Sequence, residues 1–136
     1  MSHDPETSTK RLRIWQQNLN KSDKAHFDLI NSPLHQDWDL LLLQEPYIDT
    51  FGNTKVNSKW HTLYLSSRLT DEATDRSVIL VNMALDTNIW VQVPFAGSND
   101  VTAIQIQLPQ GQITVYNIYN DCRHSRTLER MQQHIA

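Results

Sequence analysis

Three stretches of the chain carry polar side chains of the types that bind metal ions and phosphates. Glu45 follows four consecutive leucines, Asn18 and Asn20 follow the first apolar segment, and Tyr119 lies near the end of a later one. Carboxylate and amide oxygens suit Mg²⁺ or Mn²⁺, which bind through one or two carboxylates together with waters and substrate phosphates. A tyrosine hydroxyl can donate a hydrogen bond to a phosphate oxygen. These residue types therefore favour metal-assisted chemistry on a phosphate.

Each of these residues also has a plainer interpretation. Glu45 can lie in a turn, cap a neighbouring helix or pair with an arginine. Asparagine favours turns in any protein, so Asn18 and Asn20 can simply begin a loop. Tyr119 can be a half-buried strand aromatic, as is common. Asn117 shares a strand face with Tyr119 and is an accessory candidate, whereas Tyr116 faces the other side and is predicted in the core.

The residue types alone leave these alternatives open, so the elements that position the side chains matter. Leu40–Leu43 is too short to cross a membrane and is typical of a strand buried on both faces. Such a strand would hold Glu45 rigidly at its end. Residues 11–18 are predicted to form a strand beside it, and between the two we expect a helix that begins at Ser22 and ends near Pro33. This order predicts a βαβ-like unit.

The rest of the chain alternates between apolar strands and polar loops. Residues 101–108 alternate cleanly, and Pro109-Gln110-Gly111 is predicted to be a hairpin turn. Further strands are expected at 61–66, 77–82, 89–93 and 112–120, loops at 46–59 and 68–75, and a final helix at Ser125–Ile135. The order predicts a mixed α+β protein with two sheets or one large sheet.

The composition limits the classes of protein to which the chain can belong. The 136 residues suffice for one domain, predicted over 10–136, after a disordered tail at 1–9. The net charge of -3 gives no bulk attraction to nucleic acid, and three glycines exclude a Gly-rich phosphate loop. A single cysteine, no signal segment and no membrane-length apolar run predict an intracellular, non-membrane protein.

Histidines and basic residues give weaker signals. The six histidines show no metal-ligand spacing. Basic residues gather in two groups, one near the N-terminus (Lys10, Arg11, Arg13, Lys21, Lys24) and one near the C-terminus (Arg123, Arg126, Arg130). Both groups are typical of solvated surfaces, but they would grip a phosphate backbone if they flanked the site.

Three segments together resemble a known superfamily. Residues 13–20 (RIWQQNLN), 39–46 (DLLLLQEP) and 113–120 (ITVYNIYN) are similar in order and spacing to the endonuclease/exonuclease/phosphatase superfamily, whose fold is called DNase I-like. Within it, the likeness is greatest to the apurinic-type endonuclease domains of non-LTR retrotransposons. The LLLQEP element is the most specific of the three.

This resemblance implies a four-layer α/β/β/α sandwich, of which the chain would form the N-terminal half, and divalent-metal hydrolysis of phosphoesters. It matches Glu45 to the family's main Mg²⁺ ligand and Asn18 to an asparagine of the metal and phosphate site. Tyr119 matches the tyrosine that contacts the scissile phosphate. Asn20 stands where many members have aspartate, so its role there is less defined.

The sequence also departs from that family. It contains no G-D-F-N and no S-D-H sequence, the two elements that orient the attacking water in the superfamily. We therefore expect an incomplete DNA endonuclease-like domain that acts on DNA when intact. The alternatives are a non-catalytic truncated fragment and a phosphatase of the same fold acting on a lipid or inositol phosphate. A half sandwich would also expose an apolar sheet face, which predicts self-association.

Overall fold

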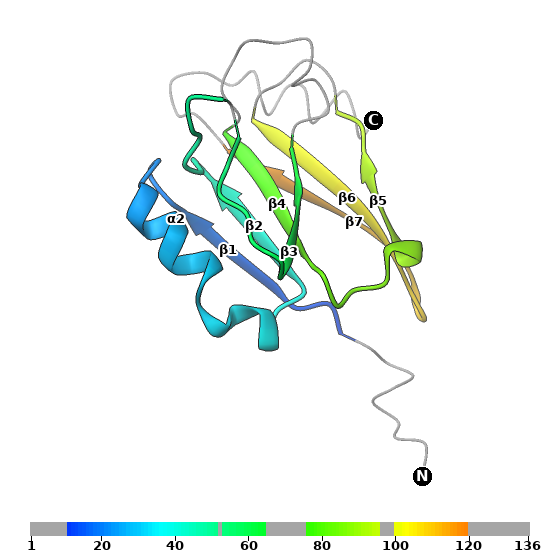
Figure 1. Cartoon of the computed structure of the whole chain (residues 1–136). Coiled ribbons are helices and arrows are strands. Elements are labelled where there is room, and N and C mark those ends of the chain that lie inside the picture. Colours follow the sequence, from blue (N-terminus) through cyan, green and yellow to red (C-terminus); the bar gives the residue numbers. More distant parts are fainter. Residues whose placement is uncertain (1–10, 52, 65–75, 96–99, 120–136) are drawn as a thin grey trace.

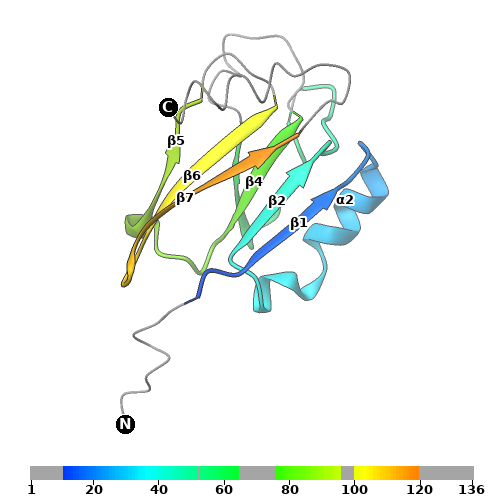
Figure 2. The same ribbon diagram turned by 180° about the vertical axis from the view of Figure 1, so that it is seen from behind.

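The computed structural model describes residues 11–51, 53–64, 76–95 and 100–119, and it contains two β-sheets and one helical layer (Figures 1 and 2). The first sheet has the strand order β1-β2-β4-β3 and the second has the order β5-β6-β7. The strands are β1 (Ile14–Asn18), β2 (Leu40–Gln44), β3 (Trp60–Leu63), β4 (Ser77–Asn82), β5 (Trp90–Val93), β6 (Val101–Leu108) and β7 (Gly111–Ile118). The helical segments are α2 (Asp23–Ile30) and the 3₁₀ turns η1 (Pro33–Gln36) and η2 (Thr87–Ile89). The mixed α+β prediction is confirmed.

The predicted βαβ-like unit is also confirmed. Strands β1 and β2 are parallel neighbours, and α2 connects them through η1. Helix α2 begins where expected, because the Ser22 side chain accepts a hydrogen bond from the Ala25 amide at 3.1 Å. None of the helices that the structure describes is long and apolar enough to cross a membrane.

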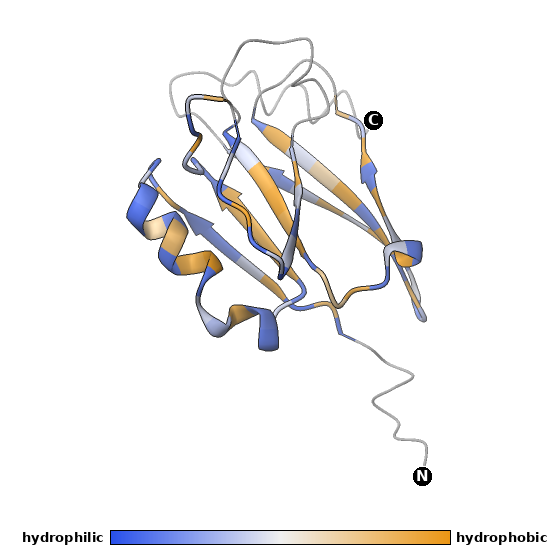
Figure 3. Ribbon diagram, in the orientation of Figure 1, coloured by the Kyte–Doolittle hydropathy of each residue, from blue (hydrophilic) through white to orange (hydrophobic). Residues whose placement is uncertain are grey.

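The four leucines of β2 are all buried because the strand is covered on both faces. Leu41 and Leu43 pack with Leu29 and Ile30 of α2, whereas Leu40 and Leu42 face the second sheet. Alternating side chains of one strand thus reach two separate cores. Figure 3 shows apolar residues concentrated on the central strands β2 and β4.

Several boundaries differ from the sequence expectation. Strand β1 begins at Ile14 rather than at residue 11, and β7 begins at Gly111, directly after the two-residue turn Pro109-Gln110. The 46–59 loop contains an isolated antiparallel bridge between Ile48 and Thr54. The predicted tail, the 68–75 loop and the Ser125–Ile135 helix lie outside the described residues.

The two sheets are offset by one strand. β7 packs on β2 and β4, and β6 packs on β4, so the second sheet lies mainly over the two central strands of the first. The expectation of an uncovered apolar sheet face is wrong for the central strands. Leu40 and Ile79 of the first sheet are buried against Ile104 and Ile106 of the second. The second sheet is present in this chain and covers the first.

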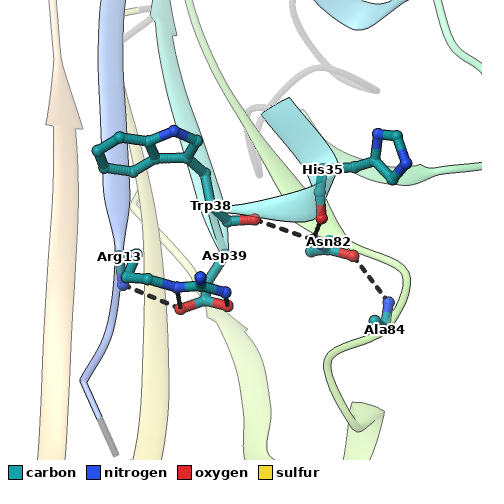
Figure 4. A network of polar contacts seen from close by, with 6 residues as sticks. All are labelled: Arg13, His35, Trp38, Asp39, Asn82 and Ala84. Carbon is teal, nitrogen blue, oxygen red and sulfur yellow. Dashed lines mark hydrogen bonds and ion pairs between the residues drawn. The ribbon is translucent and has the colours of Figure 1, made fainter. Parts of the chain in front are cut away.

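A polar clamp fixes the start of β2 against its neighbours (Figure 4). The Arg13 backbone amide donates to Asp39 Oδ2 at 2.9 Å, and its guanidinium Nη2 lies 3.2 Å from Asp39 Oδ1. Asn82 Nδ2 donates to the carbonyls of His35 and Trp38 at 2.8 and 2.9 Å. The clamp sets the register of β1, β2 and β4 at one end of the sheet. The candidate site residues lie at the other end.

Candidate active site

Asn18 and Glu45 lie at the adjoining carboxyl ends of two parallel strands. Asn18 is the register partner of Gln44, and the next residue, Leu19, donates its amide to the Gln44 carbonyl at 2.9 Å. Lys21 then donates its amide to the Glu45 carbonyl at 2.8 Å. The two segments therefore leave the sheet side by side, as the sequence predicted. The carboxyl ends of parallel strands are where α/β sheets place ligands.

Backbone strain gathers at this edge of the sheet. Among the described residues, three that are not glycine have a positive φ: Asn20 at 52°, Lys21 at 60° and Glu45 at 48°. All three lie in the turns that follow β1 and β2. This left-handed conformation is disfavoured for side chains such as lysine and glutamate, and such strain concentrates at functional sites.

The polar side chains at the edge are accessible. Asn18 and Asn20 are exposed, and Glu45 is half-buried. The Asn18 Oδ1 atom accepts a hydrogen bond from the Asn20 amide at 2.8 Å, which fixes the orientation of the Asn18 side chain. The Nδ2 group carries two donor hydrogens that take no part in this bond.

Asn117 lies beneath this edge and not on it. Its side chain is 1% exposed, and Nδ2 donates to the carbonyls of Leu43 and Val78 at 3.0 and 2.7 Å. Its Oδ1 accepts a hydrogen bond from Nε2 of the Gln44 side chain. Because both ends of the amide are occupied within the core, Asn117 joins β7 to β2 and β4. It acts on the site by positioning these strands.

The space between the sheets is polar at the end near Glu45. Gln16 donates to Gln44, which donates to Asn117. Ser77 Oγ donates to the Asn117 carbonyl and Thr102 Oγ1 donates to the Ser77 carbonyl, each at 2.7 Å. A buried polar network of this kind holds strands in one arrangement only when its members have partners. We call these five residues the amide network.

Tyr119 is linked to Glu45 through Arg76. The Glu45 amide donates to the Arg76 carbonyl at 2.9 Å, and the Arg76 guanidinium carbon lies 5.7 Å from the centre of the Tyr119 ring. Arg76 Nε also lies 3.6 Å from Asp100 Oδ1, and the Tyr119 amide donates to the Asp100 carbonyl at 2.8 Å. The structure thus brings the three segments together at one end of the sandwich.

Sequence reasoning missed Arg76, Asp100 and Gln44. Arg76 immediately precedes the strand 77–82, which was predicted correctly. A cation at the end of a strand was a signal that could have marked Arg76 as a candidate site residue. Gln44 lies on the same strand face as Leu40 and Leu42, so strand alternation alone placed it between the sheets. Nothing in the local sequence around Asp100 indicated its pairing with Arg76.

The N-terminal basic group is divided between two ends of the molecule. Arg13 belongs to the clamp, Lys24 pairs with Asp28 at 2.8 Å, and Lys21 is exposed beside Glu45. Only Lys21 of these three lies where it can meet a phosphate bound at Glu45. Lys10 and the C-terminal basic group lie outside the described residues.

His26 is buried close to the same edge but has a structural role. Its Nδ1 accepts from the Tyr47 amide at 3.2 Å, and both ring nitrogens lie within hydrogen-bond distance of Thr54 Oγ1. Burial lowers the pKa of His26 to about 4, with a smaller contribution from the nearby Lys55 charge. The ring is therefore neutral at physiological pH and anchors the 46–59 loop to α2.

Taken together, the two offset sheets, the helical cover and the strand order define a DNase I-like fold. The structure is similar to that of the endonuclease domain of TRAS1, a telomere-specific non-LTR retrotransposon, with a TM-score of 0.65 and 19% sequence identity. The similarity covers 93% of this chain and 54% of that domain, so the chain spans about half of its length. No family model and no curated protein matches the sequence. The likeness therefore establishes the fold.

Proposed function

We propose that this chain supplies the metal-binding and phosphate-binding part of a DNA phosphodiester hydrolase. One observation carries the proposal: Glu45, with its strained backbone, and the exposed Asn18 lie at the adjoining ends of two parallel strands. Arg76 connects Tyr119 to the same edge of the sheet. The fold shared with a retrotransposon endonuclease domain supports DNA as the substrate. Lys21 supplies a positive charge beside Glu45, whereas the charge of Arg76 is paired with Asp100.

The donor set suits a hard divalent cation. Within the described ranges, no three His, Cys, Asp or Glu side chains gather into a metal-binding group. Zinc needs three or four protein ligands, so these residues do not fit it. Mg²⁺ needs only one or two carboxylates, because waters and substrate phosphate oxygens complete its shell. Glu45 would hold Mg²⁺, or Mn²⁺ in its place, with Asn18 beside it and Asn20 as an accessory residue.

A cation bound there would polarise the phosphoryl oxygen and stabilise charge on the leaving oxygen. The protein's own groups would place the phosphate. The Asn18 side-chain amide and the Tyr119 hydroxyl are donors that can bind its oxygens, and Arg76, itself paired with Asp100, lies over the Tyr119 ring. Since the sequence lacks the G-D-F-N and S-D-H elements of the resembled superfamily, we expect the 136-residue chain alone to cleave DNA slowly or not at all.

The test is therefore DNA binding, measured by fluorescence anisotropy on a labelled duplex with Mg²⁺ or with EDTA. We expect Mg²⁺ to tighten binding roughly tenfold, equivalent to about 1.4 kcal/mol. Glu45→Gln should remove this dependence on Mg²⁺ because it neutralises the ligand while keeping its shape. Asp37→Asn is the matched control, since Asp37 is an exposed carboxylate next to the clamp, at the opposite end of the sheet.

Two outcomes would count against the proposal. Binding that is equally strong with EDTA would show that no metal links this site to DNA. A Glu45→Gln variant that keeps its full Mg²⁺ dependence would place the metal elsewhere. Efficient plasmid nicking by the unmodified chain, lost in Glu45→Gln, would support the metal role and contradict the expectation of an incomplete site.

A further inference from the structure

The loop that follows Glu45 carries a phenylalanine on its tip. Phe51 is 85% exposed, which is more than any other large apolar residue among those that the structure describes. It belongs to the 46–59 loop, which leaves the sheet at the carboxyl end of β2 and then runs back along the sheet to the start of β3 (Figure 1). An exposed aromatic ring lacks the stabilising free energy that burial would give it. A ring in this position would gain that free energy by contacting a partner.

The loop tip is ordered by its own hydrogen bonds. Ile48 and Thr54 form an antiparallel bridge, and the Asp49 amide donates to the Asn53 carbonyl at 2.8 Å. The Asp49 Oδ1 atom accepts from the amides of Phe51 and Asn53 at 2.8 and 2.9 Å. Phe51 is thus presented by a closed turn.

The base of the loop is fixed to helix α2. Thr54 Oγ1 donates to the Tyr47 carbonyl at 2.8 Å and contacts His26. Lys55 Nζ lies 2.7 Å from Asp23 Oδ1 and 5.1 Å from the centre of the Tyr47 ring. These contacts hold the base of the loop against α2, and the Phe51 ring lies exposed beyond them.

Chain geometry places the ring within reach of a nucleic acid held at Glu45. Phe51 lies six positions after Glu45, which limits the distance between their Cα atoms to about 20 Å. Each base step of DNA rises about 3.4 Å, so the ring lies within roughly six steps of a phosphate at Glu45. A single ring on a narrow tip suits a base surface or a base step better than a protein interface, which needs a broad patch.

We propose that Phe51 is a nucleic-acid contact that stacks on or wedges between bases beside the phosphate held at Glu45. This inference rests on the proposed function, because Glu45 fixes where the substrate lies. Apolar side chains are used in this way to unstack and bend DNA, and aromatic rings stack on bases of any sequence. Phe51 would thereby favour substrates whose bases unstack easily.

The experiment compares variants for binding to a duplex that contains 2-aminopurine, whose fluorescence reports base stacking. Phe51→Ala should weaken binding about tenfold, within the range for loss of one base-aromatic stack. It should also abolish the fluorescence change, whereas Phe51→Trp should retain both. Val56→Ala is the control, because Val56 is 62% exposed in the same loop but lies outside the bridged tip. Urea unfolding checks that each variant keeps the stability of the unmodified chain.

The results separate this inference from the function on which it rests. If the unmodified chain binds no DNA, the proposed function fails. If it binds with Mg²⁺ through Glu45 and Phe51→Ala binds equally well with an unchanged fluorescence signal, only the role of Phe51 fails. A Phe51→Ala variant that binds DNA normally but loses self-association would assign the ring to a protein contact and would likewise overturn the inference.

Discussion

Glu45 adopts a backbone conformation that side-chain-bearing residues seldom occupy. Together with Asn20 and Lys21 it forms a group of left-handed residues at the ends of β1 and β2. Such residues cost on the order of 1–3 kcal/mol each when the backbone is truly strained. The hydrogen bond from the Lys21 amide to the Glu45 carbonyl offsets part of this cost. A glycine would adopt this conformation without strain. The presence of glutamate at position 45 therefore indicates that its side chain is needed there.

His26 should make the stability of the protein depend on pH. Burial lowers its pKa in the folded state to about 4, below its ordinary value of 6.5. Above pH 6.5 the ring is neutral in both states and no stability is lost. As the pH falls from 6.5 towards 4, the unfolded chain binds a proton that the folded chain excludes. We expect a loss of up to about 3 kcal/mol over this range, measured by urea unfolding.

The control for this prediction is His26→Gln, which keeps a hydrogen-bond acceptor but does not titrate. This variant should be less stable at neutral pH and should show a shallower dependence on pH than the unmodified chain. Parallel pH profiles for the two proteins would show that His26 does not cause the dependence.

At the scale of the elements, β7 is an edge strand among the strands that the structure describes. Among the described strands it pairs only with β6, and the segment Gly111–Ile118 contains no charged residue and no proline. Gln112, Ile113 and Thr114 are exposed. Edges of this composition promote association between chains, and natural proteins usually place a charge on them. The open edge of β7, and not a sheet face, is thus where we expect self-association.

Thr114→Lys should therefore slow aggregation of the protein, because an added charge on the edge opposes pairing with another chain. The measurement is light scattering together with thioflavin fluorescence on concentrated protein. Gln107→Lys adds the same charge at an exposed position of the inner strand β6 and should have little effect. An equal delay in both variants would show that net charge, and not the β7 edge, controls aggregation.

The sequence predicted most of the elements because their signals are local. The four leucines indicated a buried strand, Ser22 indicated a helix start, and the alternation of residues 101–108 indicated a strand with one apolar face. The limits of β1 were harder to predict, since its start is fixed by the contact between Arg13 and Asp39, which are far apart in the chain. The offset between the sheets has no local signal at all.

At the scale of the whole molecule, the amide network connects the two sheets. Asn117 bonds to the carbonyls of both β2 and β4 from the second sheet. Asn117→Leu would leave those carbonyls and Nε2 of the Gln44 side chain without their partner. We expect it to lower the free energy of unfolding by about 2–4 kcal/mol. Urea unfolding followed by tryptophan fluorescence would measure this loss.

Gln112→Leu is the matched control, since it makes the same kind of change at an exposed position of the same strand. It should alter the free energy of unfolding by less than about 0.5 kcal/mol. A loss below about 1 kcal/mol in Asn117→Leu would show that water can replace the amide, and that the network contributes little to joining the sheets.

The candidate site, like the start of β1, could be predicted only in part, because contacts between residues far apart in the chain determine it. Asn18, Glu45 and Tyr119 were found as residue types at the ends of strands, and the structure gathers them at one end of the sandwich. Arg76 and Gln44 carried local signals, a cation at a strand end and strand alternation, but their contacts depend on which strands become neighbours. Asn117 was predicted on the same strand face as Tyr119, but its burial depends on β2 and β4, which lie far away in the sequence.

The clamp between Arg13 and Asp39 has a consequence for how the chain length can vary. Asn18 lies five positions after Arg13, and Gln44 lies five positions after Asp39. An insertion of one residue in either interval would turn every later side chain to the opposite face of its strand. An insertion of two would restore the face but displace the strand end by about 6.6 Å. Evolutionary insertions and deletions should therefore be absent from both intervals and be accommodated in the loops that follow them.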